Sequence, residues 1–275
     1  MKEEINKIIR HIYNVKGTDL NIFEPSFLRE RIKKRMGNTS TLNFENYLGL
    51  LKTDSQEADR LVDLLFIKHS QFFRNSLTFE ILENIVLPQI VNDKINRKEK
   101  HIRIWSAGCA DGQEPYSLAM LINEVCLSEK YEFVVDIFGT DLSRAALQCA
   151  KKGWYFSENM DHVKYFYLNK YFIKKQDRFE ICKQIKDLVN FSLYDLLEKK
   201  TIAPPACIYA GFDLIMCGNL LMYYNETTQK FILNKLYRAL DNRSWLVVGE
   251  SEASAVKNFG HFNTFNRAGR IYSKD

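Results

Sequence analysis

The chain has 275 residues, 46% of them hydrophobic and 27% charged, with a formal net charge of +5. This composition is that of an ordinary globular protein with one large domain, or with one medium and one small domain. No apolar run approaches the roughly 20 residues needed to span a bilayer, which excludes a membrane-inserted protein. The modest positive charge suggests an acidic partner surface and does not require nucleic acid.

The six cysteines are scattered without C-x-x-C spacing, and neither they nor the five histidines form a ligand cluster. We therefore expect reduced, structural thiols and no metal site. The N-terminus carries acidic residues at once and no apolar stretch before a cleavage site. This pattern predicts a protein that is not exported and remains in the cytoplasm.

The first part of the chain shows only helical periodicity. Residues Ile5, Ile8, Ile9, Ile12 and Tyr13 recur at helical spacing, and further helices are predicted over Phe27–Met36, Phe44–Leu51 and Ser55–Ile67. The composition then changes over residues 68–75, before a helix predicted over Leu77–Gln89. We predict a helical N-terminal domain over residues 1–70 and a second domain over 71–275.

From His101 onward, strand-like runs alternate with amphipathic helices. The predicted strands are His101–Ser106, Phe133–Thr140, Phe212–Cys217 and Trp245–Gly249, and the predicted helices are Pro115–Cys126, Ser143–Lys152 and Thr227–Leu240. This alternation predicts an α/β domain with a mostly parallel sheet. Residues Phe262–Tyr272 predict a closing antiparallel hairpin, and Tyr165–Phe191 predict a small β-rich insertion.

The segment Ile104–Met120 reads as a buried strand, a glycine-bearing turn and an opening helix. Gly108 and Gly112 allow the backbone to pass close to a ligand, and Glu114 can accept hydrogen bonds from a sugar diol. Only two glycines are present, so the spacing departs from G-x-G-x-x-G and weakens a nicotinamide or flavin interpretation. We interpret the segment as a cradle for another cofactor.

The second strand ends at Gly139-Thr140-Asp141. Ligands of open α/β sheets lie at the carboxyl ends of the strands, so Asp141 is placed to bind the ribose hydroxyls of an adenosine. The alternative is that Thr140 and Asp141 only cap the helix that begins near Ser143.

The run Ser106-Ala-Gly-Cys-Ala-Asp-Gly-Gln-Glu-Pro-Tyr-Ser-Leu-Ala119 resembles the signature loop of the chemotaxis-receptor methyltransferases, the CheR family. Its members carry a close variant of Ser-Ala-Gly-Cys-Ser-Thr-Gly-Glu-Glu-Pro-Tyr-Ser-Leu-Ala, and the similarity extends over nearly the whole chain. It implies a Rossmann-like class I methyltransferase dependent on S-adenosylmethionine (SAM), with a mostly parallel sheet, an antiparallel C-terminal strand, a small all-helical N-terminal domain and a small β insertion. The implied cofactor contacts here include Ala107, Gly108, Glu114 and Asp141.

Two further segments are similar to the family. Residues Ser70–Arg74 resemble Thr-x-Phe-Phe-Arg, whose Thr and Arg approach the methionine part of the cofactor and the methyl group. This implies a cofactor contact for Ser70 and a cofactor and catalytic role for Arg74, which is otherwise an exposed charge at a helix start. Asp195-Leu196-Leu197 stands where the family has Asn-Leu-Leu near the adenine, which implies that Asp195 and Leu196 bind the cofactor.

The third strand and its loop, Asp213–Tyr224, resemble Asp-Leu-Ile-Phe-Cys-Arg-Asn-Val-x-Ile-Tyr-Phe. The resemblance implies that Asn219 contacts the cofactor and that Tyr223 faces the reacting centre, whereas Tyr224 is expected to pack over the sheet end. Gly218 replaces the family Arg and cannot supply its bidentate hold on a carboxylate. Either another cation substitutes, with Arg74 the nearest candidate, or the substrate differs, or activity is weak.

The predicted helix Phe27–Met36 has an apolar stripe of Leu28, Ile32 and Met36, with Arg31, Lys34 and Arg35 gathered beside it. In the family a similar helix meets the receptor's methylation region, and a plain solvated face is the alternative. After the last parallel strand, Glu250 and Glu252 invite a general-acid pairing. We expect them instead in a solvated loop.

The resemblance implies an O-methyltransferase that esterifies glutamate side chains in the cytoplasmic region of methyl-accepting chemoreceptors. A glutamate acceptor is already ionised at neutral pH, with a pKa of about 4.3, so the site needs no strong base. One alternative is a methyltransferase with another substrate, although no Asn/Asp-Pro-Pro-Tyr/Phe motif points to nucleic acid. Another is a non-catalytic SAM-sensing signalling module, suggested by Gly218.

Overall fold

The computed structural model describes residues 2–66, 70–129, 131–207 and 211–275. The chain divides into two compact units: a helical unit of residues 1–67 with 221–231, and a sheet unit of residues 68–220 with 232–275. None of the helices in the described residues has the length and apolar character needed to cross a membrane. In the same residues, no three His, Cys, Asp or Glu side chains lie close enough together to hold a metal ion.

The helical unit contains α1 (Lys2–Lys16), α2 (Pro25–Asn38), α3 (Phe44–Thr53) and α4 (Ser55–Leu65). The side chain of Glu24 caps α2, which has proline at its first position, and side chains also cap α3 and α4. The apolar stripe of α2 is buried. The four predicted helices are confirmed, but α2 continues through Gly37, and the predicted end of α4 at Ile67 falls outside the described residues.

The sheet unit is built on seven strands in the order β6-β2-β1-β7-β8-β10-β9. These are β1 (His101–Ala107), β2 (Val134–Asp141), β6 (Val189–Leu193), β7 (Phe212–Cys217), β8 (Leu240–Val248), β9 (Asn263–Asn266) and β10 (Ile271–Lys274). The first five in spatial order are parallel, and β10 runs antiparallel to β8 and β9. The predicted α/β class, parallel sheet and closing hairpin are confirmed.

The helices of this unit are α5 (Ser76–Ile81), α6 (Leu87–Arg97), α7 (Gln113–Ser128), α8 (Arg144–Lys152), α11 (Glu226–Ala239) and α12 (Ala253–Phe259). The helix predicted over Leu77–Gln89 is longer, because a π-helical turn at Leu82–Val86 joins α5 to α6. Helices α6 and α7 pack against each other and against β1, and the first residues of α11 group with the helical unit. Short 3₁₀ turns are Leu20–Ile22, Ser157–Asn159, Leu221–Tyr223 and Glu250–Glu252.

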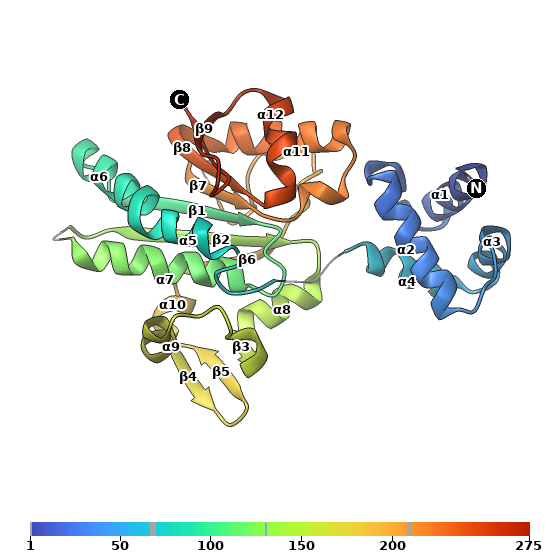
Figure 1. Ribbon diagram of the computed structural model, residues 1–275, viewed down its shortest axis with the longest axis horizontal. Helices are drawn as coiled ribbons and strands as arrows, with labels where there is room; N and C mark the ends of the chain where they lie inside the picture. The colour runs from blue at the N-terminus through green and yellow to red at the C-terminus, as the bar shows by residue number, and fades with distance from the viewer. Residues whose placement is uncertain (1, 67–69, 130, 208–210) are drawn as a thin grey trace. The chain divides into compact units, whose positions relative to one another are not determined.

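The insertion forms the yellow lobe that lies below α7 in Figure 1. It holds a small antiparallel sheet of β3 (Trp154–Phe156), β5 (Arg178–Ile181) and β4 (Phe172–Lys175), with α9 (Tyr165–Tyr171) and α10 (Lys183–Lys186). The predicted bounds of Tyr165–Phe191 need correction at both ends. The lobe's sheet starts earlier, at β3, whereas Val189 to Leu193 pair with β2 as the edge strand of the main sheet.

Candidate functional site

A glycine turn follows β1 at the carboxyl edge of the sheet. The backbone amides of Gly108 and Cys109 donate to the carbonyl of Thr140 at 2.8 and 2.9 Å, which ties this turn to the end of β2. Gly108 and Gly112 have φ values of 81° and 90°, in the left-handed region that favours glycine. A Cβ on Gly112 would also lie 2.7 Å from the Cβ of Ala150. Glycine at position 112 therefore lets the turn pack directly against α8.

Asp141 connects the two loops at this edge. One carboxylate oxygen accepts from the amide of Ala110 at 2.9 Å, and the other accepts from the amide of Ser143 at 2.8 Å. The cap of α8 is Ser143, whose hydroxyl accepts from the amide of Ala146. Asp141 is partly exposed. It is the residue after Thr140, which pairs with the buried Ala107 at the end of β1. The carboxylate is thus held in place at the end of β2, while another residue caps the helix.

Glu114 stands in the first turn of α7 and accepts a hydrogen bond from the hydroxyl of Ser106 at 2.7 Å. Desolvation, together with the charge of the nearby Glu252, raises the pKa of its carboxyl to about 7, although the hydrogen bond from Ser106 and the charge of Arg74 oppose the rise. A positively charged ligand beside Glu114 would favour its ionised form.

Glu252 lies beside two of the predicted site residues, Asn219 and Glu114. It is 1% exposed, and its Oε2 atom accepts from the amides of Gly249 at 2.6 Å and Asn219 at 2.9 Å. The expectation of a solvated loop is wrong for Glu252, because the 3₁₀ turn after β8 folds its carboxylate onto the loop after β7. Glu250 is the exposed member of the pair. The available signal was the position of Glu252 just after a parallel strand.

Five of the predicted site residues line one small pocket: Ser70, Arg74, Gly108, Glu114 and Asn219. Gln71, Phe79 and Gly218 complete its lining. A Cβ on Gly218 would meet only Oε2 of Glu114, at 3.2 Å. Glycine therefore leaves the pocket wall without a side chain at the position of the family arginine.

The turn that carries Arg74 is strained. Phe73 and Asn75 have φ values of 49° and 62°, and a bulky residue in this region costs on the order of 1–3 kcal/mol. The conformation is held because Phe73 donates its amide to the hydroxyl of Ser117 at 3.1 Å and packs its ring on Phe79. Arg74 is thereby fixed in the pocket wall, and the neighbouring phenylalanines are buried packing residues.

The segment Asp195–Leu197 lies beside Asp141, because the amide of Tyr194 donates to the carbonyl of Asp141 at 3.2 Å. Leu196 is buried, whereas Asp195 is exposed and accepts from the amide of Leu197 at 2.8 Å. These two residues do not line the pocket of Arg74 and Glu114. They follow β6, the strand that pairs with β2.

Tyr223 belongs to the helical unit. Its carbonyl accepts from the amide of Glu24 at 2.9 Å, and its ring lies 4.8 Å from that of Phe27. Tyr224 is buried, as expected of a packing residue, and its ring stacks on Phe23. The Leu221–Phe231 segment is thus fastened to the N-terminal helices.

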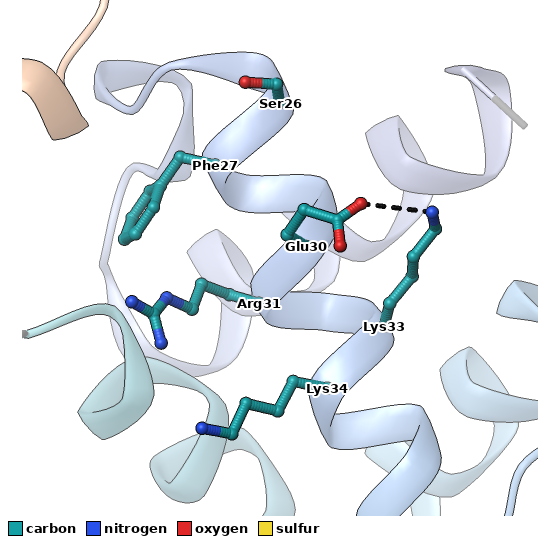
Figure 2. Close-up of a pocket in the computed structure, with 6 residues that line it drawn as sticks. All are labelled: Ser26, Phe27, Glu30, Arg31, Lys33 and Lys34. Atoms are coloured by element: carbon teal, nitrogen blue, oxygen red, sulfur yellow. Dashed lines mark hydrogen bonds and ion pairs between the residues drawn. The ribbon is translucent and has the colours of Figure 1, made fainter.

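Figure 2 shows Arg31 and Lys34 on one side of α2, which we call the α2 basic face, and Lys33 on the other side, where it pairs with Glu30 at 3.1 Å. With Ser26, Phe27 and Glu30 these residues line a depression of about 570 Å³. The Arg31 guanidinium lies 5.0 Å from the Phe27 ring centroid. The prediction that Arg35 belongs to this face is wrong, because Arg35 forms two hydrogen bonds to the buried Glu57, at 2.8 and 2.6 Å.

Comparisons with known proteins bear on both units. Residues 68–269 match the family described as CheR methyltransferase, SAM binding domain, and residues 3–66 match CheR methyltransferase, all-alpha domain. A chemotaxis protein methyltransferase of Borreliella burgdorferi is 31% identical over 254 residues, covering 91% of this chain and 88% of that protein. One from Listeria innocua is 30% identical, covering 86% and 84%. One from Escherichia coli is 27% identical, covering 93% and 84%.

Proposed function

Because the chain belongs to the CheR methyltransferase family, we propose that it is a SAM-dependent O-methyltransferase that esterifies glutamate side chains of chemoreceptors. The family itself establishes the cofactor and the class of reaction. The proposal concerns the acceptor, which we assign to the cytoplasmic region of methyl-accepting chemoreceptors. The observation that supports it most is the single pocket that gathers Ser70, Arg74, Gly108, Glu114 and Asn219.

The residues of the cradle fit SAM. The backbone at Ala107 and Gly108 would allow the cofactor to approach closely. Asp141 and Glu114 would accept hydrogen bonds from the ribose hydroxyls or face the positive charge of the cofactor. Asp195 and Leu196 would border the adenine. Ser70, Arg74 and Asn219 would border the methionine part. When bound, the cofactor supplies a methyl group on a positively charged sulfur. The raised pKa of Glu114 supports this assignment, since a cationic ligand offsets the cost of its ionisation.

The chain's own contribution is alignment rather than proton transfer. The described pocket lining contains no histidine, cysteine or lysine, and a glutamate acceptor needs no deprotonation at neutral pH. Arg74 is the only cationic side chain in that lining, so it would hold the acceptor carboxylate in place of the arginine that Gly218 replaces. Arg74 and Tyr223 would orient the acceptor, and water would have to be excluded from its carboxylate.

The test uses purified protein, labelled SAM and chemoreceptor cytoplasmic fragments. The expected product is a base-labile methyl ester, and Arg74→Ala is expected to lower its rate by about 10- to 100-fold, as for a lost hydrogen bond to a charged group. Arg74→Lys should lose less, and the exposed Ser128→Ala should match the parent protein. No base-labile ester on any receptor fragment would refute the acceptor assignment.

Gly218 favours one alternative, a non-catalytic SAM-sensing module, because the wall facing Glu114 lacks a side chain. Calorimetric binding of SAM without turnover on any receptor fragment would support the sensor. Transfer to a different acceptor would instead identify a methyltransferase with another substrate.

A further inference from the structure

Lys235 is a buried lysine on α11, only 5% exposed. Lysine is almost never buried to this degree unless its amine is paired. Here the amine donates to the hydroxyl of Tyr194 at 3.2 Å and to the backbone carbonyl of Glu198, and it lies 5.0 Å from the Tyr194 ring centroid. The amine therefore joins α11 to the loop that follows β6.

That loop is folded around the Tyr194 hydroxyl. The hydroxyl donates to the carbonyl of Thr201 at 3.1 Å while it accepts from Lys235. Burial lowers the pKa of Lys235, and the charges of Asp195 and Glu198 only partly offset this effect. The buried amine is stabilised by its hydrogen-bond partners. Removing the amine therefore leaves the Tyr194 hydroxyl and the Glu198 carbonyl without this donor.

Tyr194 also contacts both strands that form the cradle. Its amide donates to the carbonyl of Asp141 at 3.2 Å. Its ring lies 5.8 Å from that of Trp105, whose indole donates to the hydroxyl of Thr140 at 2.9 Å. Lys235 is thus connected through one tyrosine to the ends of β1 and β2.

We propose that Lys235 is a positioning residue for the cofactor: through Tyr194 and the Glu198 carbonyl, it holds the Asp195–Leu197 segment against the cradle. The segment is anchored on one side by the amide of Tyr194 and on the other by the carbonyl of Glu198, and Lys235 bonds to both of these residues. The inference rests on the proposed adenine-side role of Asp195 and Leu196. It does not depend on the identity of the methyl acceptor.

The test measures binding of S-adenosylhomocysteine and of adenosine by calorimetry, without any receptor. Lys235→Met should weaken both ligands by the same factor, about tenfold, because only the nucleoside side is affected. Tyr194→Phe keeps the ring and should weaken both ligands by a smaller factor. Lys230→Met, an exposed lysine on the same helix, is the matched control and should change neither.

A role limited to stability would lower the number of binding sites per chain and leave the Kd unchanged. That result, or Kd values within twofold of the parent for Lys235→Met and Tyr194→Phe, would overturn the proposal. With an active preparation, the Lys235→Met variant should raise the KM for SAM and keep kcat within twofold at saturating cofactor. Failure to methylate receptors would leave the binding result interpretable, so the two proposals fail separately.

Discussion

At the scale of single residues, Glu114 predicts a pH-dependent cofactor affinity. Its pKa is raised to about 7, so the ionised fraction rises from roughly a tenth at pH 6 to nine tenths at pH 8. If the positively charged cofactor binds the ionised form, the affinity for SAM should rise by about tenfold over this range. Calorimetric titrations at both pH values measure it, and Glu114→Gln should remove most of the dependence.

The raised pKa of Glu114 should also make the stability of the cofactor-free protein depend on pH. The unfolded chain ionises this carboxyl near its ordinary pKa of about 4.3, whereas the folded protein resists ionisation up to about pH 7. Glu114 therefore contributes no penalty below pH 4, and a growing one as the pH rises to 7. The Tm of Glu114→Gln should exceed that of the parent more at pH 8 than at pH 5. Equal differences at both pH values would contradict the shift.

The residues that sequence reasoning found are those whose signal is local. Gly108 and Glu114 stand in one contiguous motif, and the motif folds as a single turn and helix start. The burial of Glu252 and of Lys235 was not predicted, because their partners are distant in sequence, at Asn219 and Tyr194. From sequence alone a charged residue is predicted to be exposed, because the partner that allows its burial is known only from the tertiary structure.

At the scale of elements, an ion pair between α2 and α4 predicts the stability of the helical unit. Glu57 is fully buried and accepts from Arg35 and from the Tyr47 hydroxyl, the latter at 2.8 Å. Glu57→Gln removes the negative charge that pairs with Arg35, so the free energy of unfolding should fall by about 3–5 kcal/mol. Urea unfolding followed by circular dichroism measures this, and Glu30→Gln, an exposed carboxyl on α2, should change it by less than about 1 kcal/mol.

The pH dependence of this pair has the opposite sign to that of Glu114. Burial alone would raise the pKa of Glu57, but the hydrogen bonds from Arg35 and Tyr47 hold it below its ordinary value. Its stabilising contribution is present above about pH 4.3 and is lost as the pH falls through the lowered value. The parent should therefore lose stability faster than Glu57→Gln on acidification. Parallel pH profiles would argue against a paired carboxylate.

The elements themselves were predictable where burial is uniform. Every residue of β7 is buried, and its bounds agree with the prediction because a continuous apolar run has a clear start and end. The edge strand β6 mixes buried and exposed residues, so it was assigned to the insertion. The start of β8 was missed because Asp241 to Arg243 are polar and exposed, and only its second half carries the apolar signal.

At the scale of the whole molecule, the α2 basic face predicts salt-sensitive recognition of an acidic receptor surface. Lys34→Glu reverses one exposed charge on that face and should raise the KM for receptor fragments several-fold, with the affinity for SAM unchanged. Lys151→Glu makes the same charge change on an exposed residue of α8, in the sheet unit, and serves as the control. Equal effects of the two variants would indicate net charge rather than a defined docking surface.

Tyr223 and the α2 basic face belong to the same unit. Tyr223 lies in the 221–231 segment, which belongs to the helical unit, and its ring contacts Phe27 of α2. If Tyr223 orients the acceptor, Tyr223→Phe should lower kcat by about tenfold through its hydroxyl and leave the ring contact intact. Phe27→Ala should lower kcat as well, because it removes the ring that supports Tyr223.

The affinity of both variants for S-adenosylhomocysteine should equal that of the parent, since the pocket residues all belong to the sheet unit. Steady-state methylation of receptor fragments and calorimetry separate these two quantities. A loss of cofactor affinity in Tyr223→Phe would mean that the tyrosine serves the cofactor rather than the acceptor. An unchanged kcat in both variants would remove Tyr223 from the proposed mechanism and leave Arg74 as the orienting residue, because Arg74 is fixed by its own turn in the pocket wall.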